Sequence, residues 1–150
     1  MTCSHCAHFH ETGYPHLKAK YIDTGKVRFV IREFPFDPLA TAAFMLARCS
    51  GDKRDAMVDL LFSQQNNWAF SNQPLQGLKN LTKQTGMSDA TFDACLKDQK
   101  LYENVTAVAE RGGKQFGVDS TPTFFINGKR VTGALSPDEL DKQLAPFIKS

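Results

Sequence analysis

Two cysteines separated by two residues stand near the start of the chain, in the sequence Cys3-Ser4-His5-Cys6. This spacing places two thiols within disulfide reach at the first turn of a predicted helix. Free backbone N–H groups and the positive end of the helix dipole stabilise a thiolate there, and His5 can add a positive charge nearby. We therefore expect Cys3 to be the nucleophile, while the more shielded Cys6 closes the disulfide or resolves a mixed one.

A CxxC spacing also occurs in zinc ribbons and at haem attachment sites, so the surrounding residues must distinguish these uses. Haem attachment needs a histidine directly after the second cysteine, where this chain has Ala7. A structural zinc site needs four ligands, but Cys49 and Cys95 are lone and far apart in the sequence. His8 and His10 lie about 200° apart on a helix, so at most one of them can join the two thiolates. The residues favour redox chemistry, with no metal and no cofactor.

The composition suits one domain, or a domain with one insertion: 150 residues, of which 41% are hydrophobic and 23% charged. The 18 basic and 16 acidic residues are interspersed and leave a net charge of +2, which does not indicate a nucleic-acid or membrane-surface protein. The sequence contains no apolar run of membrane-spanning length, so we expect no membrane insertion. Four cysteines are compatible with two disulfides in an oxidising compartment, or with four thiols.

Apolar spacing predicts a helix over residues 3–21, kinked near Pro15, and a mostly buried strand over residues 27–34. From residue 38 to residue 118 the sequence contains only helical patterns, whose apolar stripes are typical of a helical-bundle core. These expected helices cover residues 39–49, 56–65, 75–85, 88–96 and 101–116.

Strand character returns near the end of the chain. Asn127-Gly128 lies between two β-prone runs and predicts a hairpin, because a type I′ turn needs a positive φ at both positions. The sequence Ser136-Pro137-Asp138-Glu139 has the pattern of a capping box and predicts a final helix. The large apolar side chains expected to face a core are Leu140, Leu144, Phe147 and Ile148 in this helix, and Trp68, Phe70, Phe124 and Phe125 before it.

The order of these elements resembles that of the bacterial DsbA-type thiol:disulfide oxidoreductases. The resemblance covers nearly the whole chain and rests on Cys3–Cys6 and on the segment Ser120–Gly128. It implies an α/β architecture, a thioredoxin-like fold with an inserted all-helical domain. Residues 1–37 and 119–150 would then form the thioredoxin-like core, with the CxxC helix in the first part and the hairpin and closing helix in the second. Residues 38–118 would form the helical insertion.

The resemblance also implies roles for individual residues. In the family, the proline corresponding to Pro122 is cis and the residue before it faces the active-site sulfurs, so Thr121 and Pro122 would bind substrate together with Ser4. An ordinary trans proline in a loop is the alternative, since a cis X–Pro bond is a minority state. Cys3, Cys6 and His5 would be the catalytic residues. Ser4 stands where the best-known members have a proline.

The chain departs from the family at its start. The family begins with a central strand that runs directly into the CxxC helix, and this chain has no residues for that strand. We expect Met1 to be internal to a longer natural chain that also carries an export signal. The buried acidic residue that the family places on this strand cannot be assigned here.

Cys49 and Cys95 lie on two different predicted helices. Some relatives carry an extra disulfide in the helical domain, and the resemblance therefore favours a Cys49–Cys95 disulfide. Closing this loop would contribute about 4 kcal/mol in the chain-entropy model. The alternative is a pair of buried thiols that act as small apolar side chains.

The expected function is therefore disulfide formation or exchange in exported proteins, catalysed by Cys3 and Cys6 in the bacterial periplasm. The partners would be thiol-containing protein substrates and a membrane or thiol redox partner, without nucleic acid. Two alternatives stay open at this point: a cytosolic thiol-disulfide reductase, and a module that binds copper or zinc through the two thiolates.

Overall fold

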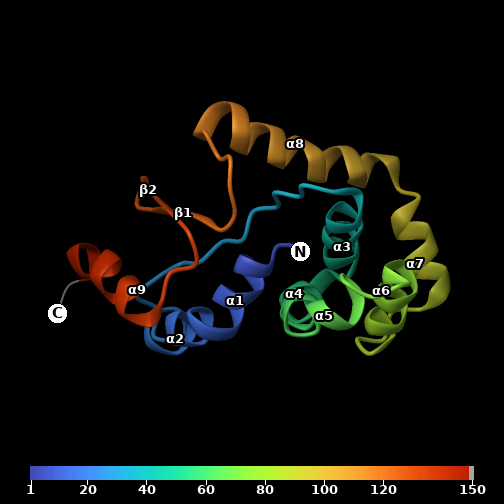
Figure 1. Ribbon diagram of the computed structural model, residues 1–150, viewed down its shortest axis with the longest axis horizontal. Coiled ribbons are helices and arrows are strands. Elements are labelled where there is room, and N and C mark those ends of the chain that lie inside the picture. Colours follow the sequence, from blue (N-terminus) through green and yellow to red (C-terminus); the bar gives the residue numbers. More distant parts are fainter. Residues whose placement is uncertain (149–150) are drawn as a thin grey trace. The chain divides into compact units, whose positions relative to one another are not determined.

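The structure, a computed structural model, describes residues 1–148 and divides into two compact units (Figure 1). The helical unit consists of Met1–Thr2 and Arg32–Gly117, and the hairpin unit consists of Cys3–Ile31 and residues 118–148. Each unit has buried apolar side chains of its own. Within residues 1–148, none of the helices combines the length and the apolar character that crossing a membrane requires.

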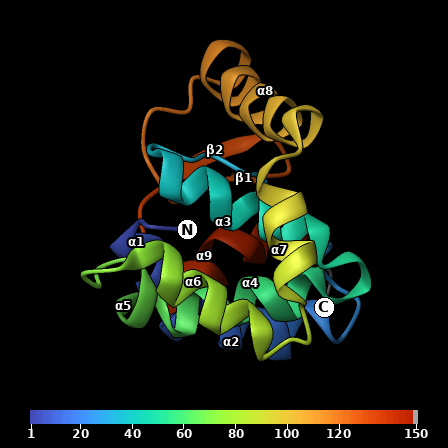
Figure 2. The same cartoon turned by 90° about the vertical axis from the view of Figure 1, so that its right-hand side faces the viewer.

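The helical unit is organised around α3 (Pro38–Cys49), the helix against which four others pack (Figure 2). These are α4 (Arg54–Ser63), α6 (Pro74–Lys83), α7 (Asp89–Leu96) and α8 (Gln99–Phe116). The 3₁₀ turn η2 (Gly51–Lys53) leads into α4, and the short helix α5 (Gln65–Trp68) precedes α6. The predicted helices are thus present, with ends that differ by a few residues.

Side-chain caps explain where three of these helices begin. Asp37, Ser88 and Asp98 each accept a hydrogen bond from a backbone N–H in the first turn of α3, α7 and α8, respectively. Such bonds satisfy N–H groups that have no partner inside the helix. At the other end of α8, Gly117 adopts φ 63°, a left-handed conformation that favours glycine and ends the helix.

Trp68 is central to the core of the helical unit. Its side chain is fully buried, and its indole N–H donates a hydrogen bond of 2.8 Å to the Leu61 carbonyl. Gly77 lets α6 approach α5 here, because a Cβ atom at this position would lie 3.0 Å from the Trp68 Cα. The prediction that Phe70 is a core residue is wrong: it follows the end of α5 and is 59% exposed.

A disulfide joins Cys49, the last residue of α3, to Cys95 in α7. The two cysteines are 46 residues apart in the sequence, and the S–S distance is 2.05 Å. The bond therefore closes a long loop that contains α4, α5 and α6.

In the hairpin unit, the first predicted helix is broken where the sequence indicated a kink. It consists of α1 (Ser4–Thr12), α2 (Tyr14–Leu17) and a π-helical stretch, η1 (Lys18–Ile22). Gly13, at the break, has a packing role: a Cβ atom there would lie 2.5 Å from the Leu135 carbonyl oxygen and 2.8 Å from the Phe9 ring. Glycine thus lets this turn of the chain approach the segment before the last helix.

The sheet of residues 1–148 is the antiparallel pair β1 (Thr123–Ile126) and β2 (Lys129–Thr132). The predicted turn is confirmed, since Asn127 has φ 46° and Gly128 has φ 87°. Side chains of β1 alternate, so Phe124 packs against the core and Phe125 points outward and is 46% exposed. The expected core position of Phe125 is therefore wrong.

The last helix, α9 (Pro137–Leu144), begins with the predicted capping box between Ser136 and Glu139. Leu140 and Leu144 are buried in the core of the unit, beside Phe9, Leu17, Tyr21 and Leu135. Phe147 is 43% exposed, contrary to the prediction. The α-helical spacing does not extend to it, because a 3₁₀ turn, η3 (Ala145–Phe147), follows Leu144.

Asp141 links α9 to α2 and η1 within the hairpin unit. Its carboxylate accepts hydrogen bonds from Lys20 Nζ at 2.7 Å and Tyr21 Oη at 2.6 Å, and lies 2.7 Å from His16 Nε2. These hydrogen bonds, that of His16 first, hold the pKa of the Asp141 carboxyl well below its ordinary value.

The predicted strand over residues 27–34 is wrong, because no residue in this range belongs to a strand. Burial nevertheless alternates along it, with residues 27, 29, 31 and 33 more buried than residues 28, 30 and 32. This period of two is that of extended backbone. A strand also needs a neighbouring strand, and the sheet of the described residues is limited to β1 and β2, which pair with each other.

Glu33 is the one acidic side chain within this segment, and it is only 3% exposed. Its Oε1 accepts hydrogen bonds from Arg48 Nε at 2.7 Å and from Arg54 Nη2 at 3.4 Å. Burial is the largest single influence and would raise the pKa of Glu33. The hydrogen bond from Arg48, a backbone hydrogen bond and the charges of Arg48 and Arg54 together outweigh it, so the pKa lies below its ordinary value. All three residues belong to the helical unit.

We predict that Arg48→Met lowers the free energy of unfolding by about 2 kcal/mol, since it leaves a buried carboxylate with a weaker partner. The full difference in stability between wild type and variant, measured by urea unfolding, should be present near pH 7. It should shrink as the pH falls through the lowered pKa of Glu33, where protonation removes the charge in the wild type as well. The control is Lys83→Met, which breaks the exposed ion pair with Asp89 and should change stability little. Equal effects of the two substitutions would contradict the prediction.

Candidate active site

Cys3 is the N-cap residue of α1. Its backbone is extended (φ −76°, ψ 119°), and its Sγ accepts a hydrogen bond of 3.3 Å from the Cys6 backbone N–H. A thiol is unusual in this position, which serine, threonine, asparagine or aspartate normally fill. The sulfur thereby takes the place of a capping oxygen, at the positive end of the helix. Both Cys3 and Cys6 are free thiols and are half-buried.

Phe9 positions the helix that carries the two cysteines. It is the buried residue of α1, and its ring lies edge-on to that of Phe124 in β1, with 4.8 Å between the ring centroids. Offset and edge-on contacts between aromatic rings are favourable beyond the area they bury. Because Phe124 follows Thr121 by three residues, this contact brings the segment before β1 to the start of α1. The sequence patterns around Phe9 and Phe124 mark each residue as apolar, but neither pattern predicts that the two rings are in contact.

Thr121 is the residue that this arrangement places against Cys3. The Cys3 thiol lies 3.5 Å from the Thr121 carbonyl oxygen, to which it donates a long hydrogen bond. The Thr121–Pro122 peptide bond is cis, and both residues are half-buried. The structure thus brings Cys3, Cys6, Thr121 and the start of α1 together within the hairpin unit.

The two thiols differ sharply in acidity. Burial alone would raise the pKa of Cys3, but hydrogen bonds from the side chains of Thr121 and Cys6 and from the Cys6 and His5 backbone N–H groups bring it below its ordinary value. At Cys6, burial is the main cause that raises the pKa, to about 12, and the charge on Cys3 adds to it. One proton is therefore lost easily from the pair, and the other stays on Cys6.

Ser4 and His5, the two residues between the cysteines, have exposed side chains. His5 acts on Cys3 through its backbone N–H. The positive charge that the His5 imidazole was expected to add near Cys3 is a separate effect, and it stays a prediction.

The described residues contain no group of three or more His, Cys, Asp or Glu side chains that could hold a metal ion. His8 is exposed, and His10 stacks on Tyr14 with 4.8 Å between the ring centroids. A metal at this site would therefore depend on the two thiolates and on ligands from elsewhere.

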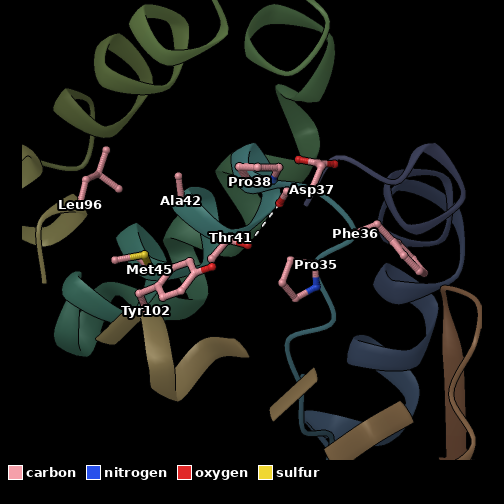
Figure 3. A pocket seen from close by; sticks show the side chains of 9 residues that line it. All are labelled: Pro35, Phe36, Asp37, Pro38, Thr41, Ala42, Met45, Leu96 and Tyr102. Atoms are coloured by element: carbon pink, nitrogen blue, oxygen red, sulfur yellow. Dashed lines mark hydrogen bonds between the residues drawn. The ribbon is translucent and has the colours of Figure 1, made fainter. Parts of the chain in front are cut away.

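A pocket of about 400 Å³ lies in the helical unit (Figure 3). Its lining is mainly apolar and includes the hydrogen bond of 3.2 Å from the Thr41 hydroxyl to the Asp37 carbonyl. The lining residues are Pro35, Phe36, Asp37, Pro38, Thr41, Ala42, Met45, Leu96 and Tyr102. None of them is a predicted site residue, and all belong to the helical unit, whereas both free cysteines belong to the hairpin unit.

Comparison with known proteins agrees with this geometry. Residues 1–145 match the sequence profile of a family described as "Thioredoxin". A Rickettsia bellii protein, provisionally named a protein-disulfide oxidoreductase, is 38% identical over 129 residues, which are 85% of this chain and 50% of that protein. The chain thus spans about half the length of the curated relatives it matches.

Solved structures agree in fold. The crystal structure of alpha-DsbA1 from Wolbachia pipientis has a TM-score of 0.90 and 25% sequence identity, and the match covers 97% of this chain and 80% of that one. A protein-disulfide isomerase from Novosphingobium aromaticivorans has a TM-score of 0.85 with coverage of 99% and 88%, and its 21% identity speaks to the fold alone. The predicted thioredoxin-like fold with a helical insertion, and the resemblance to DsbA-type proteins, are confirmed.

The unequal thiols can be tested by alkylation. We predict that, in the reduced protein, iodoacetamide modifies Cys3 before Cys6, because only a thiolate reacts and the Cys3 thiolate forms at lower pH. The pH dependence of modification, followed by peptide mass, should give a midpoint below the ordinary thiol value for Cys3 and a much higher one for Cys6. In urea the two cysteines should react alike, which is the control. Faster modification of Cys6 in the folded protein would contradict the assignment.

Proposed function

The chain belongs to the thioredoxin family, and we propose that it is a thiol:disulfide oxidoreductase whose redox pair is Cys3 and Cys6. The observation that carries this proposal is the asymmetry of the pair. The Cys6 N–H at the start of α1 and the Thr121 side chain both lower the pKa of Cys3, whereas burial keeps the proton on Cys6. A sulfur whose thiol pKa is lowered is ionised in a larger fraction of molecules at neutral pH, and it is a good leaving group.

The reaction begins with the oxidised pair and a substrate thiolate. The substrate sulfur attacks Cys3 Sγ, a mixed disulfide forms, the Cys3–Cys6 bond breaks, and Cys6 leaves and takes up a proton. The substrate's second thiolate then attacks the substrate sulfur of the mixed disulfide, which closes the substrate disulfide and releases Cys3 as a thiolate. Two electrons pass to the pair, one substrate proton ends on Cys6, and the other enters the solvent.

The environment of Cys3 favours the direction of disulfide donation. Every contact that stabilises the Cys3 thiolate stabilises the reduced pair, and therefore makes the oxidised pair a stronger oxidant. The hydrogen bonds from Thr121, Cys6 and the His5 backbone all act in this sense. The reduced pair must then pass its two electrons to the disulfide of a redox partner before the next turnover.

We assign substrate contacts to Ser4, Thr121 and Pro122, and a catalytic role to His5. Ser4 and His5 are exposed at the start of α1, where an approaching sulfur would meet them. Thr121 and Pro122 lie half-buried before β1, and extended substrate backbone can pair beside such a segment. The substrates on this proposal are proteins with free thiols.

An oxidising compartment, the bacterial periplasm, fits this function. The Cys49–Cys95 disulfide supports it, because structural disulfides persist in such compartments and are rare in reducing ones. A membrane-bound or small-thiol redox partner would restore the oxidised pair there.

The test is the redox equilibrium of the pair in glutathione buffers of graded ratio, read by alkylation and mass. We predict a reduction potential well above that of glutathione, hence a pair that donates its disulfide. Cys3→Ser should abolish exchange. In the same buffers, Cys6→Ser should accumulate a mixed disulfide of Cys3 with glutathione. The Cys3 thiolate attacks oxidised glutathione and releases one glutathione thiolate, and no Cys6 thiol remains to displace the second.

Other outcomes separate the alternatives. A potential well below that of glutathione would make the protein a reductase. A pair that never forms a disulfide, but retains copper or zinc through dialysis, would replace the proposed function with metal binding.

A further inference from the structure

Residues 117–122 contain Thr121 but belong to no helix or strand. Their shape must therefore come from contacts with other parts of the hairpin unit. One contact is made by backbone: the Gly133 N–H donates a hydrogen bond of 2.9 Å to the Pro122 carbonyl. This bond holds the end of the segment at β1 but leaves residues 119–121 to be fixed by side chains.

Thr123, the first residue of β1, supplies one of these side chains. Its hydroxyl donates a hydrogen bond of 2.7 Å to the Ser120 carbonyl. The bond spans Thr121 and Pro122 and closes a tight loop over them. It therefore restrains Thr121 as a whole: the carbonyl oxygen that lies 3.5 Å from Cys3 Sγ, and the side chain that lowers the pKa of Cys3.

Arg130 on β2 supplies a second restraint. Its Nη2 lies 2.8 Å from Asp119 Oδ1, and the same carboxylate oxygen accepts a hydrogen bond of 3.1 Å from the Ser120 hydroxyl. The carboxylate thus joins the hairpin to the residue just before Thr121. Arg130 and Asp119 are 38% and 78% exposed, so their attraction is screened by salt and is the weaker of the two restraints.

We propose that Thr123 and Arg130 are positioning residues for the redox pair: they hold residues 119–121 so that Thr121 faces Cys3. Neither residue touches the reacting sulfurs. Both act through Thr121, whose side chain is the largest of the contacts that stabilise the Cys3 thiolate. The inference rests on the proposed function, because it concerns how strongly the same pair oxidises.

The direction of the effect follows. When the Thr121 segment is released, Cys3 loses part of its stabilisation as a thiolate, its pKa rises, and the disulfide becomes harder to reduce. One hydrogen bond of ordinary strength corresponds to about a two- to tenfold change in an equilibrium. We therefore expect Thr123→Val to shift the glutathione equilibrium toward the disulfide form by about that factor.

The experiment compares matched variants of the full chain. Thr123→Val keeps the shape of the side chain and removes the hydroxyl, whereas Thr123→Ser keeps the hydroxyl and should restore wild-type behaviour. Arg130→Met removes one positive charge from β2. Lys129→Met is the matched control, because it removes the positive charge next to Arg130. The Lys129 Nζ donates a hydrogen bond of 3.0 Å to Gln143 on α9, not to residues 119–121. For each protein, the pH dependence of Cys3 alkylation, the glutathione equilibrium and the urea unfolding midpoint are measured.

The inference is supported if Thr123→Val and Arg130→Met raise the Cys3 midpoint and shift the equilibrium, while Thr123→Ser and Lys129→Met do neither. The effect of Arg130→Met, but not that of Thr123→Val, should disappear at about 1 M salt. The inference is overturned if Thr123→Val leaves both the Cys3 alkylation midpoint and the glutathione equilibrium unchanged. It is also overturned if the shifts in these two quantities are simply proportional to the loss of stability across all four variants. A wild-type pair that forms no disulfide would instead overturn the proposed function, so the two failures are distinct.

Discussion

The contact between Phe9 and Phe124 is the constraint on which the site depends. The two rings belong to parts of the chain that are separated in sequence by nearly all of the helical unit, and burying them together removes a large apolar surface from water. No hydrogen bond between Cys3 and Thr121 can form unless α1 lies on the hairpin in this way. The redox chemistry that we propose thus depends on a packing contact between residues that take no part in it.

The same spacing that makes Cys3 and Cys6 near neighbours also gives them opposite surroundings. Cys3 lies outside the first turn of α1, where backbone N–H groups face it, and Cys6 lies inside the helix and is more deeply buried. Helix geometry alone imposes this difference on any CxxC pair at a helix start. The segment that contains Thr121 then determines how large the difference becomes.

The elements that local chemistry specifies could be predicted from the sequence. Asn127-Gly128 makes its turn because of backbone conformation, and the capping box at Ser136 makes its bonds within four residues. The prediction for residues 27–34 failed because a strand also requires a neighbour, which local pattern does not supply. The prediction that Phe147 faces the core failed because the helix ends earlier than the apolar spacing suggests. The bond from Arg130 to Asp119 depends on how the hairpin meets the chain before it, and no spacing rule contains that information.

The hairpin unit is assembled from two stretches, and nearly all of the helical unit lies between them in sequence. Synthesis runs from the N-terminus, and units of nearly continuous chain can fold as they emerge. The helical unit can therefore form its core, and bring Cys49 to Cys95, while residues 118–148 are still absent. Cys3 and Cys6 are made first, but the part of their difference in acidity that depends on Thr121 arises last, when that residue has been made.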